Sequence, residues 1–316
     1  MDLDRLKLFA QAAELGSLSK VAGISGAAQS AISRKITALE QECGGRLFSR
    51  TGRGVALTEF GERIFPRVKA LLADADQLLS EMKTSAGVAM GTVHIGMMPS
   101  LAHPATSYLL RQVRARFPGI HLHVVEGSGG QLDEWLISGR IDIAVLFRYG
   151  RAVPQGEQAL AVVDTFLVGH PGDTLTKKET VNFSQLDGIP LILPSIPNGL
   201  RVALARVAIQ KRVNLTVVMD ADSLPIQKNV AATGDAYAVL GSHSVGPEIK
   251  ARTLQAACII NPRIKRTIVL STTTAHPLTL AGREVATLTR RIFDDMVSEK
   301  TLKLDAPSKM NAGDSI

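Results

Sequence analysis

The sequence predicts a multidomain α+β protein with a small N-terminal head, a long helix and a C-terminal α/β domain of two lobes. The chain has 316 residues, 45% of them hydrophobic, and this length exceeds what a single core usually organises. Apolar residues recur at helical spacing over the first 50 residues and again between residues 64 and 82. From residue 92 onward, short apolar strands alternate with amphipathic helices, which is typical of an α/β domain.

The charge balance and the cysteines restrict the class of protein. The chain carries 36 Lys and Arg against 29 Asp and Glu, a formal net charge of +7, so nucleic acid is the first partner to consider. Cys43 and Cys258 stand far apart without a CxxC pattern, which favours neither a disulfide framework nor a zinc site. No segment has the features of a signal peptide or the roughly 20 apolar residues of a membrane helix. We therefore expect a cytoplasmic protein that does not enter the membrane.

The first 50 residues predict three short helices. Apolar residues between Leu3 and Ala13 mark the first helix, which Gly16 ends. Ser17 or Ser19 can cap the second helix. The third helix buries an apolar stripe and leaves polar side chains near its N-terminal half. These polar residues are Gln29, Ser30, Ser33, Arg34 and Lys35.

A β-hairpin is predicted after the third helix. The segment Arg46–Thr58 has an apolar, turn, apolar pattern with Arg50 and Arg53 at the bend. A hairpin wing can reach a nucleic acid backbone, while the start of a helix can present Gln, Arg and Ser to base edges. Six basic residues against two acidic ones between Lys20 and Arg53 are equally compatible with an ordinary solvated surface.

The order of the motifs favours the nucleic acid interpretation. Five segments in register closely resemble the winged helix-turn-helix of LysR-type transcriptional regulators: Gly16–Ser19, Ala28–Ile36, Leu39–Glu40, Leu47–Arg50 and Leu57–Gly61. The resemblance implies a DNA-binding domain over residues 1–58, with the seven polar residues named above at the DNA. The sequence departs from the family pattern at Gly23, Ser25 and Gly26, which predicts a short second helix. Ala28 replaces the usual capping Ser, and Ser30 replaces a frequent Pro.

A long helix is predicted from Thr58, its cap, to about Ser85. Pro66 lies inside it and should kink or break the first two turns. The apolar residues follow a heptad seam, which makes the same helix of a second subunit the expected partner, with a helix in a single-chain bundle as the alternative. The seam comprises Ile64, Val68, Leu71, Ala75, Leu78 and Met82. Residues 59–86 are thus assigned to dimerisation and residues 87–91 to a hinge.

The remainder of the chain predicts two lobes joined by two crossings, with a cleft suited to hinge closure on a ligand. Lobe I should comprise residues 92–163 and 267–304, lobe II residues 164–266, and residues 305–316 a flexible tail. The pattern resembles the effector-binding domain of LysR-type regulators, which is similar to periplasmic binding proteins. The predicted elements are Thr92–Met97, Tyr108–Arg116, His121–Glu126, Leu132–Ser138, Ile141–Phe147, Thr165–Gly169, Leu191–Leu193, Leu200–Gln210, Leu215–Asp220, Ser223–Ala232, Tyr237–Leu240, Thr267–Thr272 and Gly282–Met296.

Candidate effector-binding residues follow the predicted strands. Exposed amides and hydroxyls at helix starts suit an anion, although helix capping alone would also explain these serines. Arg201 could clamp a carboxylate or lie on the surface of its helix. The loop around Asn198 resembles the branch of the family that contains the nitrogen assimilation control protein. The candidates are Ser100, Leu101, Ser128, Gly129, Phe147, Arg148, Ser195, Asn198, Arg201 and Ser223.

Several other chemistries have no sequence support. Gly127–Gly130 matches neither nucleotide-binding pattern, and His94, His121 and His123 lack a carboxylate or thiolate at metal-ligand spacing. We therefore expect no cofactor, no metal and no enzyme activity. Cys258 stands alone, so the paired-cysteine peroxide sensing of some relatives is not expected, and Cys43 should be a small buried residue.

The family resemblance implies a ligand-responsive, sequence-specific regulator of transcription. Its expected partners are double-stranded promoter DNA, a small and anionic effector such as a carboxylate, RNA polymerase at the promoter, and further copies of the chain as a dimer of dimers. The alternative is a two-lobed solute-binding or enzymatic protein whose N-terminal helices serve only in assembly. This alternative predicts turnover or a transport partner and no sequence-specific DNA binding.

Overall fold

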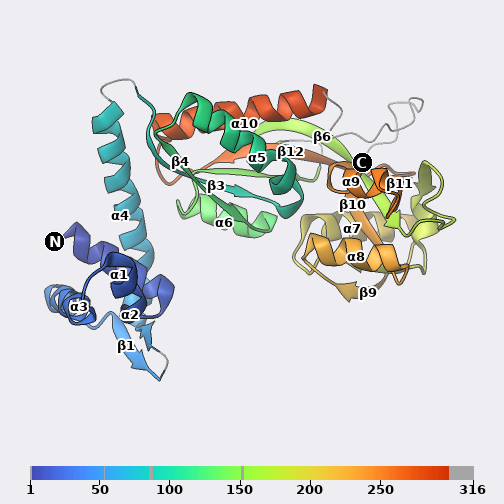
Figure 1. Ribbon diagram of the computed structural model, residues 1–316. Helices are drawn as coiled ribbons and strands as arrows, with labels where there is room; N and C mark the ends of the chain where they lie inside the picture. The colour runs from blue at the N-terminus through green and yellow to red at the C-terminus, as the bar shows by residue number, and fades with distance from the viewer. Residues whose placement is uncertain (1, 53, 85–87, 151–152, 299–316) are drawn as a thin grey trace.

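The computed structural model describes residues 2–52, 54–84, 88–150 and 153–298. A helical head and a long helix stand at one side of the molecule, and two lobes lie next to each other at the other side (Figure 1). The predicted tail lies outside the described residues, as do Arg53, residues 85 and 86 at the end of the predicted dimerisation segment, and residue 87 at the start of the predicted hinge.

The head packs three helices and a hairpin around Phe9, Leu39 and Leu47, which are almost fully buried. Gly16 ends the first helix in a left-handed conformation with φ of 61°, and Ser17 accepts a hydrogen bond from the Lys20 amide to cap the second. As expected, Ala28 provides no side-chain cap for the third helix. The elements are α1 (Leu3–Leu15), α2 (Leu18–Ser25), α3 (Gln29–Cys43), β1 (Phe48–Thr51) and β2 (Gly54–Leu57).

The long helix α4 (Glu59–Thr84) begins where predicted. The Thr58 hydroxyl accepts a hydrogen bond from the Gly61 amide at 3.0 Å, which caps the helix. The helix continues through Pro66, so of the kink or break that we expected, the break does not occur. Its first turns pack on the head, where Val68 is buried and Lys69 bonds Glu14 of α1 at 2.7 Å.

Lobe I is an α/β unit whose sheet lies between helices. The parallel strands β4, β3 and β5 are extended by antiparallel β12. Ile95, Leu109 and Phe293 are almost fully buried in its main core. The elements are β3 (Gly91–Met97), α5 (Pro99–Arg116), β4 (Ile120–Glu126), α6 (Gly129–Ile137), β5 (Ile143–Arg148), β12 (Lys265–Thr272) and α10 (Leu280–Ser298).

Helix α5 begins earlier than predicted. We expected it near position 104 and a regular helix from Tyr108, but it begins at Pro99. Proline suits the first helical position because it has no amide hydrogen to leave unpaired. The helix extends through position 104, so a second proline in its early turns does not interrupt it.

Lobe II repeats the arrangement with two cores on opposite faces of its sheet. The parallel strands β10, β8 and β9 form one side, and antiparallel β6 carries β11 at a further edge. The elements are β6 (Gln158–Gly169), β7 (Thr180–Asn182), the short helix η1 (Phe183–Leu186), β8 (Pro190–Leu193), α7 (Gly199–Lys211), β9 (Thr216–Asp220), α8 (Leu224–Thr233), β10 (Tyr237–Gly241), the short helix η2 (Ser242–Ser244), α9 (Gly246–Lys250) and β11 (Gln255–Ile260).

Two segments join the lobes. Strand β6 pairs with β12 through residues 158–164 and with β10 and β11 through residues 165–169, so it runs from the sheet of one lobe into the sheet of the other. The chain returns from β11 to β12 over residues 261–264. The two sheets are therefore continuous, and the carboxyl ends of the parallel strands in both lobes are available to build a site between them.

Candidate DNA-binding surface and effector site

The polar residues that we predicted from the sequence to contact DNA lie in the first half of α3. Ile32, Ile36 and Leu39 are buried against α1 and α2, which fixes the helix in the head. The opposite face is exposed at Gln29, Ser30, Arg34 and Lys35, and half-buried at Ser33. These side chains are therefore free to approach a partner, and their contact with DNA remains a prediction.

The hairpin is held in a fixed position relative to α3. The Glu40 carboxylate accepts hydrogen bonds from the amides of Leu47 at 2.8 Å and Phe48 at 3.1 Å. The Val55 amide donates to the carbonyl of Gly16 at 2.9 Å. Gly54 lies so close to that carbonyl that any side chain there would collide with it. The hairpin and α3 thus form one rigid surface.

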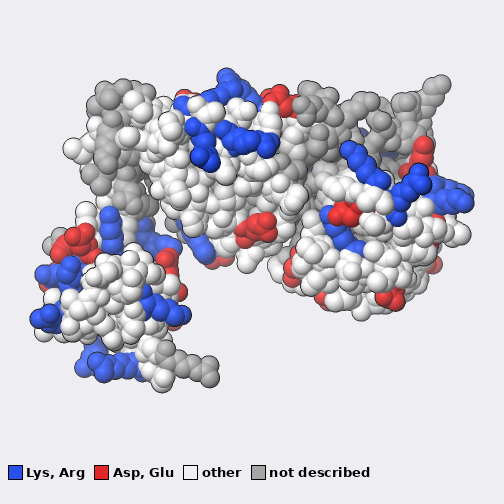
Figure 2. Space-filling view, in the orientation of Figure 1, with Lys and Arg blue, Asp and Glu red and all other residues white. Residues whose placement is uncertain are grey.

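Basic side chains gather on this surface, over α3 and beside the hairpin (Figure 2). Lys20, Arg34, Lys35, Arg46 and Arg50 are all exposed, which suits a surface that meets phosphates. Arg53 lies outside the described residues.

Cys43 does not occupy the buried position that we expected. It is the last residue of α3 and is exposed. The helix stripe that enters the core ends at Leu39, so Cys43, four positions later, lies beyond the part of α3 that the head covers. Cys258, by contrast, is buried, and burial raises the pKa of its thiol to about 11.

The candidate residues of lobe I mostly serve its own structure. Leu101 is fully buried in the core, and Ser100, half-buried, lies in the first turn of α5. Ser128 caps α6 by a reciprocal capping box with Gln131, and Gly129 is the first residue of that helix. The structure therefore gives Ser128, but not Ser100, the helix-capping role that we had set beside ligand binding.

Arg148 is already paired with two carboxylates. Its guanidinium donates to Asp133 at 2.6 and 2.9 Å and to Glu157 at 2.9 Å. These hydrogen bonds, above all those to Asp133, raise its pKa. An anionic ligand would have to displace Asp133 or Glu157 in order to use this arginine.

The candidate residues of lobe II lie at the carboxyl ends of β8 and β9. Asn198 caps α7 by accepting a hydrogen bond from the Leu200 amide at 2.9 Å, and the Ser195 amide donates to Asp222. Arg201 donates to the Pro194 carbonyl at 3.0 Å and forms an ion pair with Asp220. Ser223 precedes α8 without a side-chain capping bond.

A polar cluster that lies between the lobes was not predicted from the sequence. Phe147, at the carboxyl end of β5, contacts the ring of His243 in η2, with ring centroids 5.6 Å apart. The Arg266 guanidinium of β12 lies over the same Phe147 ring at 4.5 Å. Thr165 of β6 is fully buried beside them, opposite Gly241 in the strand register. His243 could have been suspected because it follows the third parallel strand of lobe II.

The charge states within this cluster follow from burial. Arg266 is 5% exposed and His243 is 8% exposed. Burial, and then the positive charge of Arg266, lower the pKa of His243 to about 3, so its imidazole is neutral at physiological pH. Burial raises the pKa of Tyr149, whose side chain is hydrogen bonded to Arg266.

The histidines at the far edge of lobe I meet as their strand positions suggested. His94 and His123 are paired in register, and their ring centroids are 5.1 Å apart, while His121 and His123 are both exposed. Burial and the neighbouring His94 and His121 lower the pKa of His123. Among the residues that the structure describes, no three His, Cys, Asp or Glu side chains are arranged to hold a metal ion.

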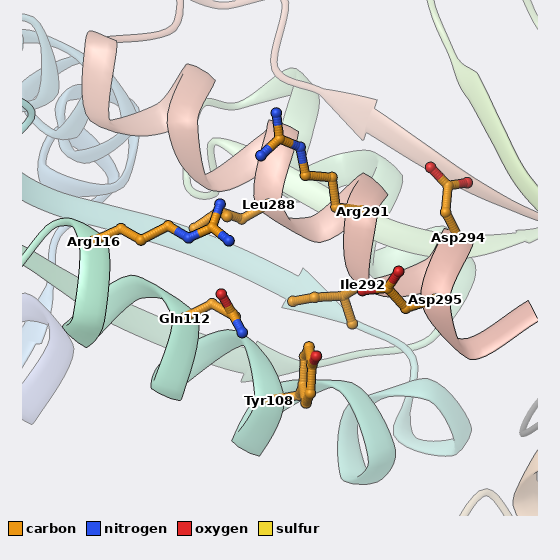
Figure 3. Close-up of a pocket in the computed structure, with 8 residues that line it drawn as sticks. All are labelled: Tyr108, Gln112, Arg116, Leu288, Arg291, Ile292, Asp294 and Asp295. Carbon is orange, nitrogen blue, oxygen red and sulfur yellow. The ribbon is translucent and has the colours of Figure 1, made fainter. Parts of the chain in front are cut away.

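A shallow groove of about 300 Å³ lies on the outer face of lobe I, between α5 and α10 (Figure 3). Arginine and aspartate side chains rim the groove, and Tyr108 and Ile292 form part of its floor. Its lining residues come from helix faces and from no strand end, so the groove is separate from the cluster at Phe147.

In comparisons with known proteins, one family model matches the N-terminal part of the chain and a second matches the C-terminal part. The family model described as "Bacterial regulatory helix-turn-helix protein, lysR family" matches residues 3–62, and the model described as "LysR substrate binding domain" matches residues 86–294. Within the described part of the chain, no helix is both long and apolar enough to cross a membrane.

Individual relatives agree with the family models. The chain is 29% identical to the nitrogen assimilation regulatory protein nac of Escherichia coli (strain K12), over 95% of this chain and 98% of that protein. It is 27% identical to the HTH-type transcriptional regulator BbuR of Bordetella bronchiseptica, over 86% and 84%. Its fold matches the crystal structure of full-length CbnR complexed with its target DNA, with a TM-score of 0.67, 18% identity and coverage of 93% and 100%.

Proposed function

This chain belongs to the LysR family of bacterial regulators, and from that membership we propose how its parts work together. It is a regulator of transcription with a helix-turn-helix DNA-binding domain and an effector-binding domain, and its relatives are regulators rather than enzymes. We propose that α3 enters the major groove of promoter DNA in the cytoplasm while the β1–β2 hairpin contacts the backbone.

The observation that carries this proposal is the rigid exposed surface built by α3 and the hairpin. Gln29 and Arg34 are exposed on the same end of α3, and Arg50 is exposed on β1. Glu40 connects the two elements through its bonds to Leu47 and Phe48. This arrangement supports base readout by the helix together with phosphate contact by the hairpin.

The effector-binding domain supplies the control. We propose that a small anionic molecule binds between the lobes and changes the subunit geometry, and hence the DNA contacts, because it binds one arrangement of the lobes better than the other. The chains would associate through α4 as a dimer of dimers and act on RNA polymerase at the promoter. The exposed Leu71, Leu78 and Met82 on α4 support this association.

Removal of two proposed DNA contacts tests the surface. The full-length variant with Arg34→Ala and Arg50→Ala should bind a duplex selected from random sequences by the wild type at least tenfold more weakly. The slope of log affinity against log salt should also fall by about 1, because the phosphate contact of the hairpin is lost. Fluorescence anisotropy over a salt series measures both quantities.

Arg206→Ala is the matched control, because this arginine is exposed on α7, away from the proposed surface. It removes the same kind of charge and should leave both the affinity and the salt slope unchanged. Wild-type affinity in the double variant would place the DNA surface elsewhere on the molecule.

A further inference from the structure

Arg266 is a buried cation without a buried anion. Its side chain is 5% exposed, and its Nε and Nη2 atoms are shielded from solvent and make no hydrogen bond. No Asp or Glu of the described chain lies within ion-pair distance of it, whereas Arg148 and Arg201 are each paired with carboxylates. A buried charge without a partner is costly, so a structure that retains one points to a missing anion.

The two unpaired atoms define which anion fits. Nε and Nη2 belong to the same edge of the planar guanidinium, and this edge donates two parallel hydrogen bonds to a planar oxyanion. The other side of the group is occupied, since Arg266 is hydrogen bonded to Tyr149 and its plane lies over the Phe147 ring at 4.5 Å. The free edge thus has the geometry of a carboxylate receptor.

Further unpaired polar groups surround this edge. Both ring nitrogens of His243 lack a hydrogen-bond partner, and so does the hydroxyl of Thr165. The backbone of Gly241, opposite Thr165 in the register, lies directly against the guanidinium and the imidazole. A neutral imidazole and a hydroxyl can each donate one hydrogen bond to the same oxyanion. Three buried side chains from three elements therefore have polar atoms without a partner around Gly241.

The cluster also joins the lobes. Phe147 and Arg266 belong to β5 and β12 of lobe I, whereas His243 lies in η2 of lobe II, which contacts α5. Because β3 and β5 are parallel and in register up to Met97 and Val145, α5 starts next to the carboxyl end of β5. An anion held here would touch both lobes at once.

We propose that Arg266, assisted by His243 and Thr165, is the receptor for a carboxylate group of the effector. The inference rests on the proposed function and deepens it, since it names the residues that anchor the anionic group. The receptor is closed to solvent in the present arrangement, so a ligand enters when η2 and α5 separate and holds the lobes together once it is bound.

Acetate is the probe for this receptor, and acetamide is its neutral counterpart. The thermal midpoint of the full-length protein is measured while either compound is titrated to about 100 mM at constant ionic strength. The wild type should be stabilised by acetate and unaffected by acetamide. Arg266→Met should abolish the acetate response, and Arg206→Met, at an exposed site, should retain it.

Arg266→Lys gives a second readout, because a lysine keeps the charge and loses the two-pronged edge. Its apparent Kd for acetate should rise about tenfold, the loss expected for one charge-assisted hydrogen bond. An undiminished acetate response in Arg266→Met or Arg266→Lys would overturn the proposal, as would a wild type that acetate does not stabilise.

These measurements need no DNA, so they are independent of the test of the DNA surface. Loss of the acetate response in Arg266→Met combined with absent DNA binding by the wild type would refute the regulator and leave the receptor in place. DNA binding by the wild type combined with an undiminished acetate response in Arg266→Met would refute the receptor alone.

Discussion

His243 is a neutral base in an unusual position for a histidine. It is 8% exposed, contacts the Phe147 ring and faces two positive charges, Arg266 and Lys228. Lys228 itself forms an ion pair with Glu248 at 2.8 Å. Burial and these charges lower the pKa of His243 to about 3 in the folded protein, against 6.5 for a free side chain.

This difference predicts a pH dependence of stability. Between pH 6.5 and about 3 the unfolded chain binds a proton at residue 243 that the folded chain does not. The contribution of His243 is therefore fully present above pH 6.5 and is lost as the pH falls, by up to about 1.4 kcal/mol per pH unit. His243→Asn should flatten the fall of the urea midpoint between pH 7 and pH 5. His103→Asn, at an exposed site, is the control, and an identical slope in His243→Asn would contradict the prediction.

The arginines of the effector domain show where sequence reasoning succeeds at this scale and where it stops. From their positions just after predicted strands, we expected Arg148 and Arg201 near the carboxyl ends of the strands in the two lobes, and the structure has them there. It could not show that Asp133 and Asp220 neutralise them, because an ion pair depends on side chains brought together by folding. Arg266 is one residue of an ordinary strand pattern, and its lack of a partner is visible only in three dimensions.

At the scale of elements, α4 is the helix whose exposed apolar side chains most clearly call for a partner surface. Its first turns pack on the head, but farther along Leu71, Leu78 and Met82 are exposed by 36%, 58% and 66%. A 26-residue helix extends about 39 Å, beyond the reach of so small a head. The burial of large apolar side chains on a second α4 would contribute about 1.5 to 3 kcal/mol each.

Charge on this stripe should separate the subunits. Leu78→Glu combined with Met82→Glu is expected to shift the sedimentation coefficient of the full-length protein toward the monomer, because it places like charges opposite each other in the α4 pair. Ile209→Glu, at a side chain of α7 that is 80% exposed, introduces the same change without effect. Unchanged assembly in the double variant would show that the subunits associate through another surface.

Most helices and long strands could be predicted from hydrophobic periodicity, and their types were confirmed. The exceptions have physical causes. The strands β7 and β11 and the helix α9 were not predicted, and the three residues of β7 are too few to establish a period. The start of α5 was misplaced because a proline that begins a helix and a proline inside it look alike in a sequence.

At the scale of the whole molecule, the continuous sheet determines what the two lobes can do. Strand β6 belongs to both sheets, and β12 pairs with it and with β5. The sequence predicted two crossings from the order of strands and helices, but not that they pair with each other. The lobes are thus connected by two strands that pair with each other, and Arg266 lies on one of these strands.

The late position of β12 and α10 also decides when each part can fold during synthesis. The head and lobe II are each built from one uninterrupted segment, but Ile268, Val285 and Phe293 complete the core of lobe I from the other end of the chain. Translation supplies residues in order, so lobe I must wait while lobe II folds. A chain that stops at Ile260 should therefore resist limited proteolysis in the head and in lobe II, and be cleaved rapidly between β3 and β5. Equal protection of all three parts would show that lobe I folds without its last strand and helix.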